Sequence, residues 1–487
     1  MIKTGIFHSF SKLNSCDGSS AIHIAMSKNE SESVIISLLS DADVENISFS
    51  IPNLPEKFTF ETEELFTVNC NGVDCPDPLV PVSSFSLKKD ALSQILVRFN
   101  AENACAGVYP ITVELRSTAL LASFTVNIKV WNFALPEEYV VNASMDIHRP
   151  SIERMHNVTD ESEKLELYKK YYDYILKFRV SPFYPPYDVL DERCDKYLDD
   201  PRLTAFILDS TKDSDTLKKY REKLSKHPKW QKKAMFYPLD EPTSKEHLDT
   251  LSERCAYVNE NYPEVRRTSA FYTDIDYDKD KDLLDVILDN CALVLPKLTC
   301  FDDDFVYATK ELCERKGSFQ ERINKAKAEG KEIWQYVCWE PGKPYVNLYV
   351  DESGLDHRVL FWQQHLVGAT GFLYWCTTWW KFVDDPWTSM ATVSDLSPFV
   401  FGDGSLLYNG NKVGIDGPCG SIRLETVRDG LEDAEMLLLA DKYLGRDLVL
   451  NEVKKVCADL KNYTDSIDVF ESVRRAIGDA LEKAINN

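Results

Sequence analysis

The sequence is short of positive charge and of long apolar runs. Its 487 residues include 56 Lys and Arg against 79 Asp and Glu, which gives a formal net charge of −23. A surface of that sign repels phosphate backbones and no local basic patch offsets it, so nucleic acid is not expected as a partner. No stretch approaches the roughly 18 consecutive apolar residues of a membrane span. We therefore expect no membrane insertion.

The signals of several other chemistries are also missing. The start MIKTGIFHSF has no charged segment followed by an apolar stretch and a cleavage site, so we expect the protein in the cytoplasm. The 13 Cys follow no fixed spacing, and Cys70 and Cys75 have no second pair or neighbouring His. This favours free thiols in a reducing compartment. Without a phosphate-binding glycine loop or a Ser-His-Asp spacing, neither a metal nor a cofactor is expected, and the oligomeric state cannot be inferred.

What the sequence does have is the composition of an ordinary globular chain, with 44% hydrophobic and 28% charged residues. Residues 1–135 alternate short β-branched and aromatic runs with turn residues. The pattern predicts an N-terminal antiparallel β-sandwich domain over 1–135, with strands that include 33–39, 93–99, 109–115 and 123–130. The composition changes at Pro136, where we place the domain boundary.

From residue 136 to 487, strand-like runs alternate with helical stretches, which is typical of βαβ units in a parallel sheet. Eight parallel strands close a barrel, so we expect 136–487 to form a (β/α)8 TIM-type catalytic barrel with C-terminal helices. The predicted strands are 142–147, 180–184, 204–208, 234–239, 265–271, 292–298, 332–338 and 371–377.

The helices of this second region are expected to be amphipathic, with acidic faces toward solvent. We predict them over 161–178, over 244–261 with Thr243 as the N-terminal cap, over 421–444 ending at Gly445, and from 451 to 487.

Two adjacent carboxylates stand out in the segment KAMFYPLDEP, residues 233–242. An apolar run leads to Asp240 and Glu241 at the end of the fourth predicted barrel strand, and Pro242 cannot continue a ladder. Side chains at the carboxyl ends of barrel strands supply the chemistry in enzymes of this architecture. The pair could instead simply begin the next helix, since Asp and Glu favour first turns. The apolar strand and the proline favour a functional role.

One acid beside one base is the equipment of a glycosidase. Neighbouring Cα atoms are about 3.8 Å apart, and repulsion between such close charges raises one pKa, so that one carboxylic acid keeps its proton near neutral pH. Ordinary glycosidases place two carboxylates roughly 5 to 9.5 Å apart on opposite sides of the sugar, which consecutive residues fit poorly. Substrate assistance fits better: an acetamido oxygen on the sugar is the nucleophile, one carboxylate orients that group and its neighbour protonates the leaving oxygen.

Aromatic residues gather at the ends of the seventh and eighth predicted strands. Because side chains alternate along a strand, about half of them must pack beneath helices instead of facing the interior. For any single residue a core position is the simpler interpretation, whereas the cluster as a whole favours stacking on a sugar ring. The cluster consists of Trp334, Tyr336, Trp339, Phe372, Tyr374, Trp375, Trp379 and Trp380.

Several segments together resemble a known family. They are PLDEP (238–242), IWQYVCWEPGKPYVNLYVD (333–351), DHRVLFWQ (356–363), GFLYWCTTWW (371–380) and SIRLETVRDGLEDAEML (421–437). Over nearly its whole length the chain resembles the domain of unknown function 4091 family, which includes glycoside hydrolase family 123. The resemblance implies a retaining, exo-acting β-N-acetylgalactosaminidase with substrate-assisted catalysis, built as a sandwich followed by a (β/α)8 barrel.

The resemblance also implies roles for individual residues. Asp240 would orient the 2-acetamido group, and Glu241 would act as general acid and then as general base. Tyr336 would hydrogen-bond the acetamido oxygen, and Trp375 would wall the pocket of that group. The expected partner is an oligosaccharide or glycoconjugate substrate.

Four further residues complete the expected substrate-binding set. Asn347 and His148 would contact sugar hydroxyls, and Trp339 and Trp379 belong to the aromatic cluster. The polar contacts that distinguish an axial from an equatorial C4 hydroxyl are not placed by the sequence.

The most recognisable segment of all, residues 421–437, is expected to be structural. The spacings from Arg423 to Asp429 and from Arg428 to Glu432 predict ion pairs at a helix start. Arg179, at the end of the first predicted helix, is open to either interpretation.

Two rival functions stay open at this point. A non-catalytic carbohydrate-binding or scaffold protein would keep the fold without hydrolysing any glycan. A glycosidase for gluco-configured or non-acetylated sugars would cleave a de-acetylated substrate equally well.

Overall fold

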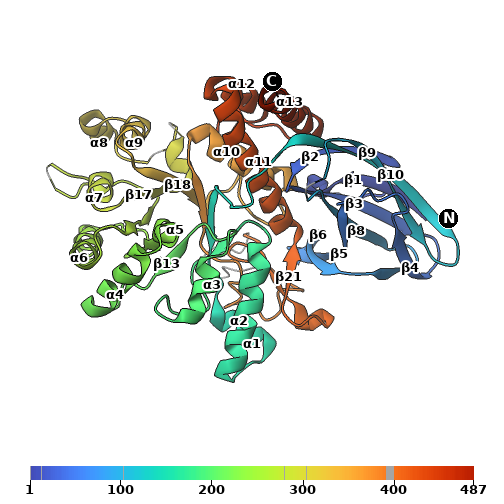
Figure 1. Ribbon diagram of the computed structural model, residues 1–487, viewed down its shortest axis with the longest axis horizontal. Helices are drawn as coiled ribbons and strands as arrows, with labels where there is room; N and C mark the ends of the chain where they lie inside the picture. The colour runs from blue at the N-terminus through green and yellow to red at the C-terminus, as the bar shows by residue number, and fades with distance from the viewer. Residues whose placement is uncertain are drawn as a thin grey trace.

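The computed structural model describes residues 2–12, 14–102, 104–278, 280–302, 304–305, 307–390 and 400–486. A β-rich region and a region of parallel strands surrounded by helices lie side by side, and α11 (Ile422–Leu444) runs between them (Figure 1). The chain is therefore a mixed α/β protein with a β-rich N-terminal region, as predicted.

The N-terminal region is consistent with the predicted sandwich. Its strands are β1 (Ile2–His8), β2 (Ala21–Lys28), β3 (Ser31–Ser40), β4 (Val44–Ser50), β5 (Thr59–Cys70), β6 (Val73–Pro81), β7 (Ser84–Leu87), β8 (Leu92–Asn100), β9 (Gly107–Arg116) and β10 (Leu120–Ala134). One sheet has the order β1-β3-β8-β5-β6-β21-β20 and the other β2-β10-β9-β4-β7, antiparallel except for the β10–β2 pair. Residues from both sheets, such as Ile36 of β3 and Val126 of β10, are fully buried in one apolar core.

The second region contains parallel strands at all eight predicted places. They are β11 (Asn142–Met145), β12 (Ser181–Pro182), β13 (Phe206–Leu208), β14 (Ala234–Phe236), β15 (Arg266–Arg267), β16 (Ala270–Phe271), β17 (Leu293–Pro296), β18 (Glu332–Val337) and β19 (Gly371–Tyr374), of which β15 and β16 share one predicted strand. The sheet orders are β12-β11-β19-β18-β17-β16 and β13-β14-β15. Each strand is shorter than predicted, and closure into a (β/α)8 barrel stays a prediction.

The side chains of these strands divide into two sets. One set, which includes Met235, Leu295 and Leu373, forms an apolar cluster contributed by strands alone. The alternate set, which includes Phe236 and Phe372, packs against helices. The period-two alternation of a strand thus defines an inner side of the parallel strands.

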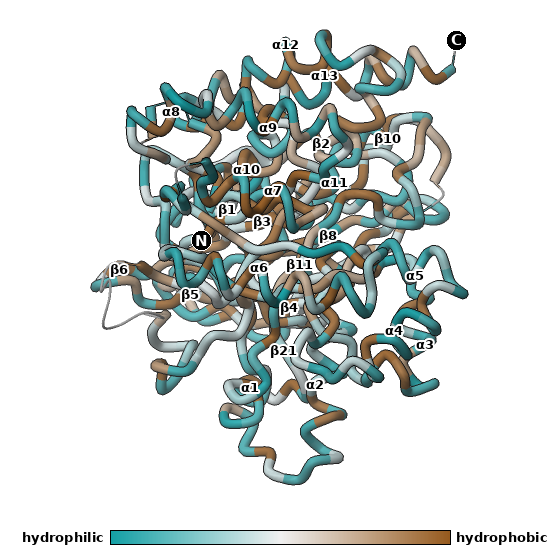
Figure 2. The backbone as a smooth tube through the Cα atoms, turned by 90° about the vertical axis from the view of Figure 1, so that its left-hand side faces the viewer, coloured by the Kyte–Doolittle hydropathy of each residue, from teal (hydrophilic) through white to brown (hydrophobic). Residues whose placement is uncertain are grey.

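The helices lie mostly around the parallel strands. They are α1 (Arg149–His156), α2 (Glu161–Leu176), α3 (Asp195–Leu198), α4 (Ser214–Ser225), α5 (Pro228–Lys233), α6 (Lys245–Asn261), α7 (Leu283–Asn290), α8 (Lys310–Lys316), α9 (Phe319–Ala328), α10 (Gly354–Val367), α11, α12 (Arg446–Val456) and α13 (Ile467–Ile485). Outer helices such as α4 alternate between hydrophilic and hydrophobic colours in Figure 2, as amphipathic helices do. Among the residues described, no helix is both long and apolar enough to cross a membrane.

Two helix predictions need correction. The cap of α6 is Ser244, whose side chain accepts from the His247 amide, and not Thr243. The stretch predicted as one helix from residue 451 is divided between α12 and α13, because residues 457–466 form a short connection between them. A Ser placed directly before the first turn is as good a cap as Thr, which is why the sequence alone misplaced the start by one residue.

The cysteines are free thiols, as expected, and most of them are buried. They behave as small apolar side chains of the core.

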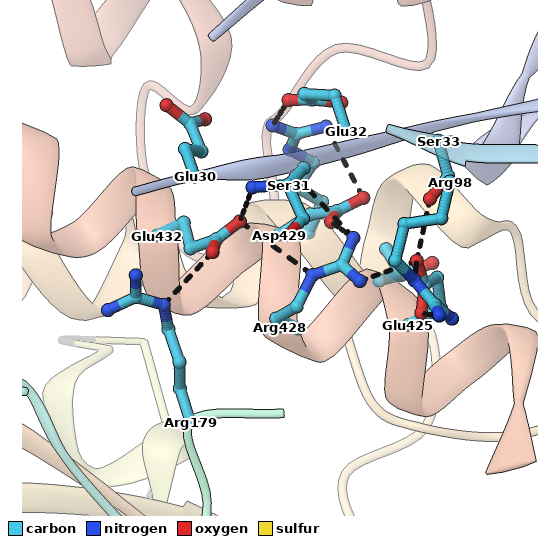
Figure 3. Close-up of polar contacts among 12 residues, drawn as sticks. Glu30, Ser31, Glu32, Ser33, Arg98, Arg179, Glu425, Arg428, Asp429 and Glu432 are labelled. Carbon is cyan, nitrogen blue, oxygen red and sulfur yellow. Dashed lines mark hydrogen bonds and ion pairs between the residues drawn. The ribbon is translucent and has the colours of Figure 1, made fainter. Parts of the chain in front are cut away.

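The two regions share a sheet and a helix. β21 (Pro418–Ser421) pairs antiparallel with β6, and β20 (Tyr408–Asn409) extends the same sheet. Glu425, Arg428 and Glu432 of α11 are buried against β3 and β8 (Figure 3). Arg428 lies near Glu432 as predicted, with Nε 3.7 Å from Oε2, whereas Arg423 pairs with Asp77 of β6 and not with Asp429. Arg179 is structural too, since it bonds Glu432 at 3.0 Å.

Candidate active site

The segment that carries the two adjacent carboxylates leaves its strand early. β14 ends at Phe236, and the next residues form a loop that reaches Asp240 and Glu241. Arg254 of α6 and Ser269 donate hydrogen bonds to backbone carbonyls of this loop at 2.6 and 2.7 Å. The loop is therefore anchored from two sides, and the pair lies beyond the carboxyl end of a parallel strand, as predicted.

Glu241 has an unusual backbone conformation. Its φ of 40° lies in the left-handed region, which costs a non-glycine residue about 1–2 kcal/mol. Such strain persists only where the surroundings impose it, and it is concentrated at functional sites. Asp240 is exposed, and Glu241 is partly buried.

Each carboxylate is held by a tyrosine from a different strand. The Tyr237 hydroxyl, just past β14, donates to Oδ1 of Asp240 at 2.6 Å and accepts from the Ala270 amide at 3.2 Å. The Tyr336 hydroxyl, from β18, donates to Oε1 of Glu241. Both tyrosines belong to the inner side-chain set of the parallel strands. The two neighbouring carboxylates therefore have separate, fixed orientations.

The surroundings of Glu241 favour its protonated form. Burial raises the pKa of this carboxyl above its ordinary value, and the Asp240 charge raises it further, while the Tyr336 hydroxyl and the Lys297 ammonium oppose the rise. Lys297 follows β17, is buried, and donates to Oε2 of Glu340 at 3.1 Å. A glutamic acid that keeps its proton to higher pH than usual is suited to donate that proton as a general acid.

Three predicted residues gather where β11 and β19 end. The rings of His148 and Trp379 are 4.6 Å apart between centroids, and those of Trp375 and Trp379 are 5.2 Å apart. Burial lowers the pKa of His148, with Lys381 adding to the effect, so its imidazole is neutral near pH 7. Nδ1 of His148 lies 2.7 Å from the Ser151 hydroxyl. These aromatic groups are partly exposed and available for contact.

The structure brings Asn347 into a different position. It is fully buried, and its amide group donates to the carbonyls of Cys338 and Pro341 at 2.8 Å each. Its oxygen accepts from the Leu348 amide at 2.8 Å. Asn347 therefore stabilises the loop after β18 through both ends of its side-chain amide. Trp339, on the same loop, is 42% exposed.

Two residues beside the carboxylate pair, Tyr237 and Lys297, were not predicted from the sequence. The period-two alternation of a strand was the available signal, because it places Tyr237 on the side of Met235 and Lys297 on the side of Leu295, which is the inner side.

Asp146 is a third such residue. Met145 packs against helices, whereas the Ser144 hydroxyl bonds to the neighbouring strand. Because side chains alternate along a strand, Asp146 lies on the same inner side of the parallel strands as Ser144. Burial raises the pKa of Asp146 to about 6.

Solved structures of glycoside hydrolases resemble this fold. A family 123 glycoside hydrolase from Clostridium perfringens, solved in a study of glycolipid glycan hydrolysis, aligns over 100% of this chain and 98% of its own, with a TM-score of 0.68 and 13% identity. A family 2 β-galacturonidase from Eisenbergiella tayi bound to glycerol aligns over 82% of this chain and 68% of its own at 13% identity, with a TM-score of 0.34. No curated protein sequence matches the chain.

A family model decides the assignment. The model described as the catalytic domain of glycoside hydrolase 123 matches residues 194–440, about half of the chain. The matched residues include Asp240, Glu241, Tyr336 and Trp375 but not His148. The chain belongs to glycoside hydrolase family 123 and is a glycoside hydrolase.

Proposed function

We propose that this enzyme is a retaining exo-β-N-acetylgalactosaminidase that uses substrate-assisted catalysis. The observation that carries the proposal is the pair of consecutive carboxylates, Asp240 and Glu241, oriented separately by Tyr237 and Tyr336. Two carboxylates on one side of a sugar cannot act as nucleophile and acid from opposite sides. They can serve one acetamido group and one leaving oxygen.

In the proposed first step, Asp240 accepts the N–H of the acetamido group and turns its oxygen toward C1. That oxygen forms a bond to C1 as the glycosidic bond breaks, and Glu241 gives its proton to the leaving oxygen. In the second step the ionised Glu241 takes a proton from water and the water oxygen attacks C1. The bond between C1 and the acetamido oxygen breaks, which restores the acetamido group. Two displacements at C1 retain the anomeric configuration.

The surrounding groups have matching tasks in this scheme. Tyr336 lies beside Glu241 and reaches the acetamido oxygen, while Trp375 packs against the methyl group. His148 and Asp146 approach from β11 and contact ring hydroxyls. Trp379 contributes an aromatic face for the sugar, and the exposed Trp339 offers one for the rest of the glycan.

We also propose that the parallel strands close into a (β/α)8 barrel, with domains at 1–135 and 136–487. The order of parallel pairing supports this, since β11 neighbours both β12 and β19. A backbone hydrogen bond of 2.7 Å from Ile207 to Phe183 links the six-stranded sheet to β13. In such a barrel the catalytic pair would lie on the carboxyl-terminal face.

The test is hydrolysis of p-nitrophenyl β-N-acetylgalactosaminide by the wild type and by Glu241→Gln. Loss of general acid–base catalysis lowers kcat by about 10²–10⁴-fold. Glu246→Gln, on the exposed first turn of α6, is the matched control and should be unaffected. Equal rates for the wild type and Glu241→Gln would remove Glu241 from the mechanism.

Two further measurements separate the rivals. Inhibition by a thiazoline mimic of the cyclised sugar is expected if the acetamido oxygen attacks C1, and indifference to it would point to an enzyme nucleophile. A de-acetylated substrate should be inert, whereas equal cleavage would favour a glycosidase for non-acetylated sugars. Absence of hydrolysis across a panel of glycosides, with binding retained in Asp240→Ala, would favour a non-catalytic carbohydrate-binding protein. The sugar substrates of the Clostridium perfringens relative, glycolipid glycans, are the first natural class to assay.

A further inference from the structure

Asp403 is a buried carboxylate that contacts an aromatic residue of the candidate site. The Trp375 indole N–H donates to Oδ1 and Oδ2 of Asp403 at 3.0 and 3.1 Å, and the Tyr374 hydroxyl donates to Oδ1 at 3.0 Å. Asp403 is completely inaccessible to solvent. It therefore cannot touch a sugar, but it fixes the edge of the Trp375 ring.

The turn that carries Asp403 also fixes the face of that ring. Gly404 has a φ of +67°, and a Cβ at this position would lie 2.2 Å from Cζ2 of Trp375. Only glycine allows the backbone to approach the indole so closely. The orientation of Trp375 is thus determined by the turn at residues 402–405.

Arg423, at the start of α11, binds the turn at residues 402–405. Its guanidinium donates to the carbonyl of Gly402 at 2.9 Å and to that of Ser405 at 2.5 Å, so both flanks of Asp403 are bound. It also donates to the carbonyl of Leu348 at 2.8 Å, on the loop after β18. Its side chain is fully buried.

The N-terminal region in turn holds Arg423. Asp77 of β6 accepts from Nε and Nη2 of Arg423 at 2.9 and 2.8 Å, which is the bidentate geometry that gives ion pairs their direction. Asp77 also accepts from the Tyr408 hydroxyl and is fully buried. An unbroken series of contacts therefore runs from a strand of the sandwich through Arg423 and Asp403 to Trp375.

We infer that Asp403 is a positioning residue that acts through Trp375, and that the Asp77–Arg423 pair fixes the turn that carries it. The β-rich N-terminal region thereby contributes to sugar binding without contacting the sugar. The inference rests on the proposed function in one respect, namely that Trp375 contacts the acetamido group of the substrate.

A double-mutant cycle tests whether Asp403 acts through the indole. Asp403→Ala, Trp375→Phe and the combined variant are compared by kcat and KM on p-nitrophenyl β-N-acetylgalactosaminide. We expect Asp403→Ala to raise KM at least fivefold, and the combined variant to be within twofold of the worse single variant, because phenylalanine has no N–H to orient. Asp403→Asn keeps an acceptor oxygen and should recover most of the wild-type KM. Effects that multiply independently would overturn the inference.

A second experiment tests the contribution of the N-terminal region. Replacing both members of a buried ion pair by apolar residues is often tolerated, so Asp77→Val combined with Arg423→Leu should fold, yet it loses the bonds to the turn. The matched control is Arg179→Met with Glu435→Leu, a buried pair 2.6 Å apart farther along α11. We expect KM to rise at least fivefold in the first pair of substitutions and to stay within twofold in the control. Should the first pair not fold, Asp77→Asn replaces it with the same expected direction, because an amide NH2 in place of one oxygen breaks the bidentate pair with Arg423.

A readout that needs no activity keeps this inference separate from the proposed function. With 5-fluorotryptophan incorporated, the ¹⁹F resonance of Trp375 is identified by its loss in Trp375→Phe. It should shift in Asp403→Ala and in the Asp77→Val, Arg423→Leu variant, and stay in place in the control. An unshifted resonance in a folded variant would overturn the inference whatever the enzyme cleaves. An inactive wild type with the expected shifts would instead refute the proposed function alone.

Discussion

Glu425 of α11 and Glu241 after β14 are two carboxylates whose surroundings shift their pKa values in opposite directions. On α11, burial alone would raise the pKa of Glu425, but Arg428 and Arg98 outweigh it and hold that pKa at about 2. At the end of β14, burial and Asp240 raise the pKa of Glu241, and the Tyr336 hydroxyl only partly offsets them. A guanidinium carries a full positive charge, whereas a hydroxyl offers only a dipole. The charge of the partner therefore distinguishes Glu425 from Glu241.

The comparison also explains why the most recognisable segment of the chain is not its chemical centre. Glu425 is bound by Ser33 at 2.6 Å and by Arg98 at 2.7 and 2.8 Å (Figure 3), so both of its oxygens are engaged, and its full burial keeps a substrate away from it. Among the residues that the structure describes, Glu241 accepts from the Tyr336 hydroxyl alone. Its second oxygen stays available for the leaving group.

The largest expected effect comes from removing Arg98 of β8, which pairs with Glu425 of α11. Arg98→Met leaves Glu425 and Glu63 buried with fewer partners, which costs about 3–5 kcal/mol of unfolding free energy. Urea unfolding measures the loss, while kcat/KM of the folded fraction should stay at the wild-type value. Arg116→Met, which breaks an exposed pair with Glu114, is the control and should cost at most about 1 kcal/mol. A loss of unfolding free energy no larger than that of the control would contradict the structural role of the buried Arg98–Glu425 pair.

The next effect extends the comparison to a third carboxylate. If Asp146 binds a ring hydroxyl, its charge-assisted hydrogen bond contributes about 1.5–3 kcal/mol, so Asp146→Ala should lower kcat/KM by roughly ten- to a hundredfold. Measuring the variant on both β-N-acetylgalactosaminide and β-N-acetylglucosaminide shows whether the contact distinguishes the C4 hydroxyl. Stability should hardly change. Unchanged kinetics on both sugars would place Asp146 with the structural acids.

A smaller effect concerns pH. A general acid must be protonated, so the rate falls as pH rises through the pKa of Glu241. Tyr336→Phe removes the hydroxyl that favours the ionised form, so this pKa rises and the alkaline limb of the kcat profile moves to higher pH. Tyr237→Phe, which loses the bond to Asp240, is the matched variant and should leave the limb nearly in place. A limb that moves downward in Tyr336→Phe would contradict the assignment of Glu241 as the acid.

The smallest effect should be seen at Trp339. Because this side chain is 42% exposed and offers a face to the rest of the glycan in the proposed scheme, Trp339→Ala should raise KM about threefold for a longer glycan and leave the p-nitrophenyl substrate unaffected. Equal changes on both substrates would place Trp339 against the terminal sugar instead.

Much of this architecture was predictable because it depends on local patterns. The order of strands and helices follows from hydrophobic periodicity, and the end of α11 at Gly445 follows from helix-stop chemistry. The proposed catalytic pair could be singled out in the sequence because an apolar run and a proline bracket it. The exact strand ends were not predictable, since β14 stops at Phe236 although apolar residues continue to Leu239.

The rest depends on contacts between residues far apart in the sequence. No sequence pattern indicates that Arg423 pairs with Asp77, which lies 346 positions earlier. The helical spacing from Arg423 to Asp429 therefore predicted the wrong partner. The partners of Asn347 could not be foreseen for a related reason, because the carbonyls that engage its amide are brought together only by the folded loop. Such partners become visible only in three dimensions.

The pairing of β21 with β6 has a consequence for biosynthesis. During translation, β6 leaves the ribosome long before residues 418–421 are synthesised. The edge of β6 that later pairs with β21 is therefore unpaired while the intervening residues are made. An open edge of this kind invites pairing with other nascent chains. A fragment that stops near residue 135 should therefore aggregate, and adding a peptide of residues 405–424 during refolding should keep it monomeric.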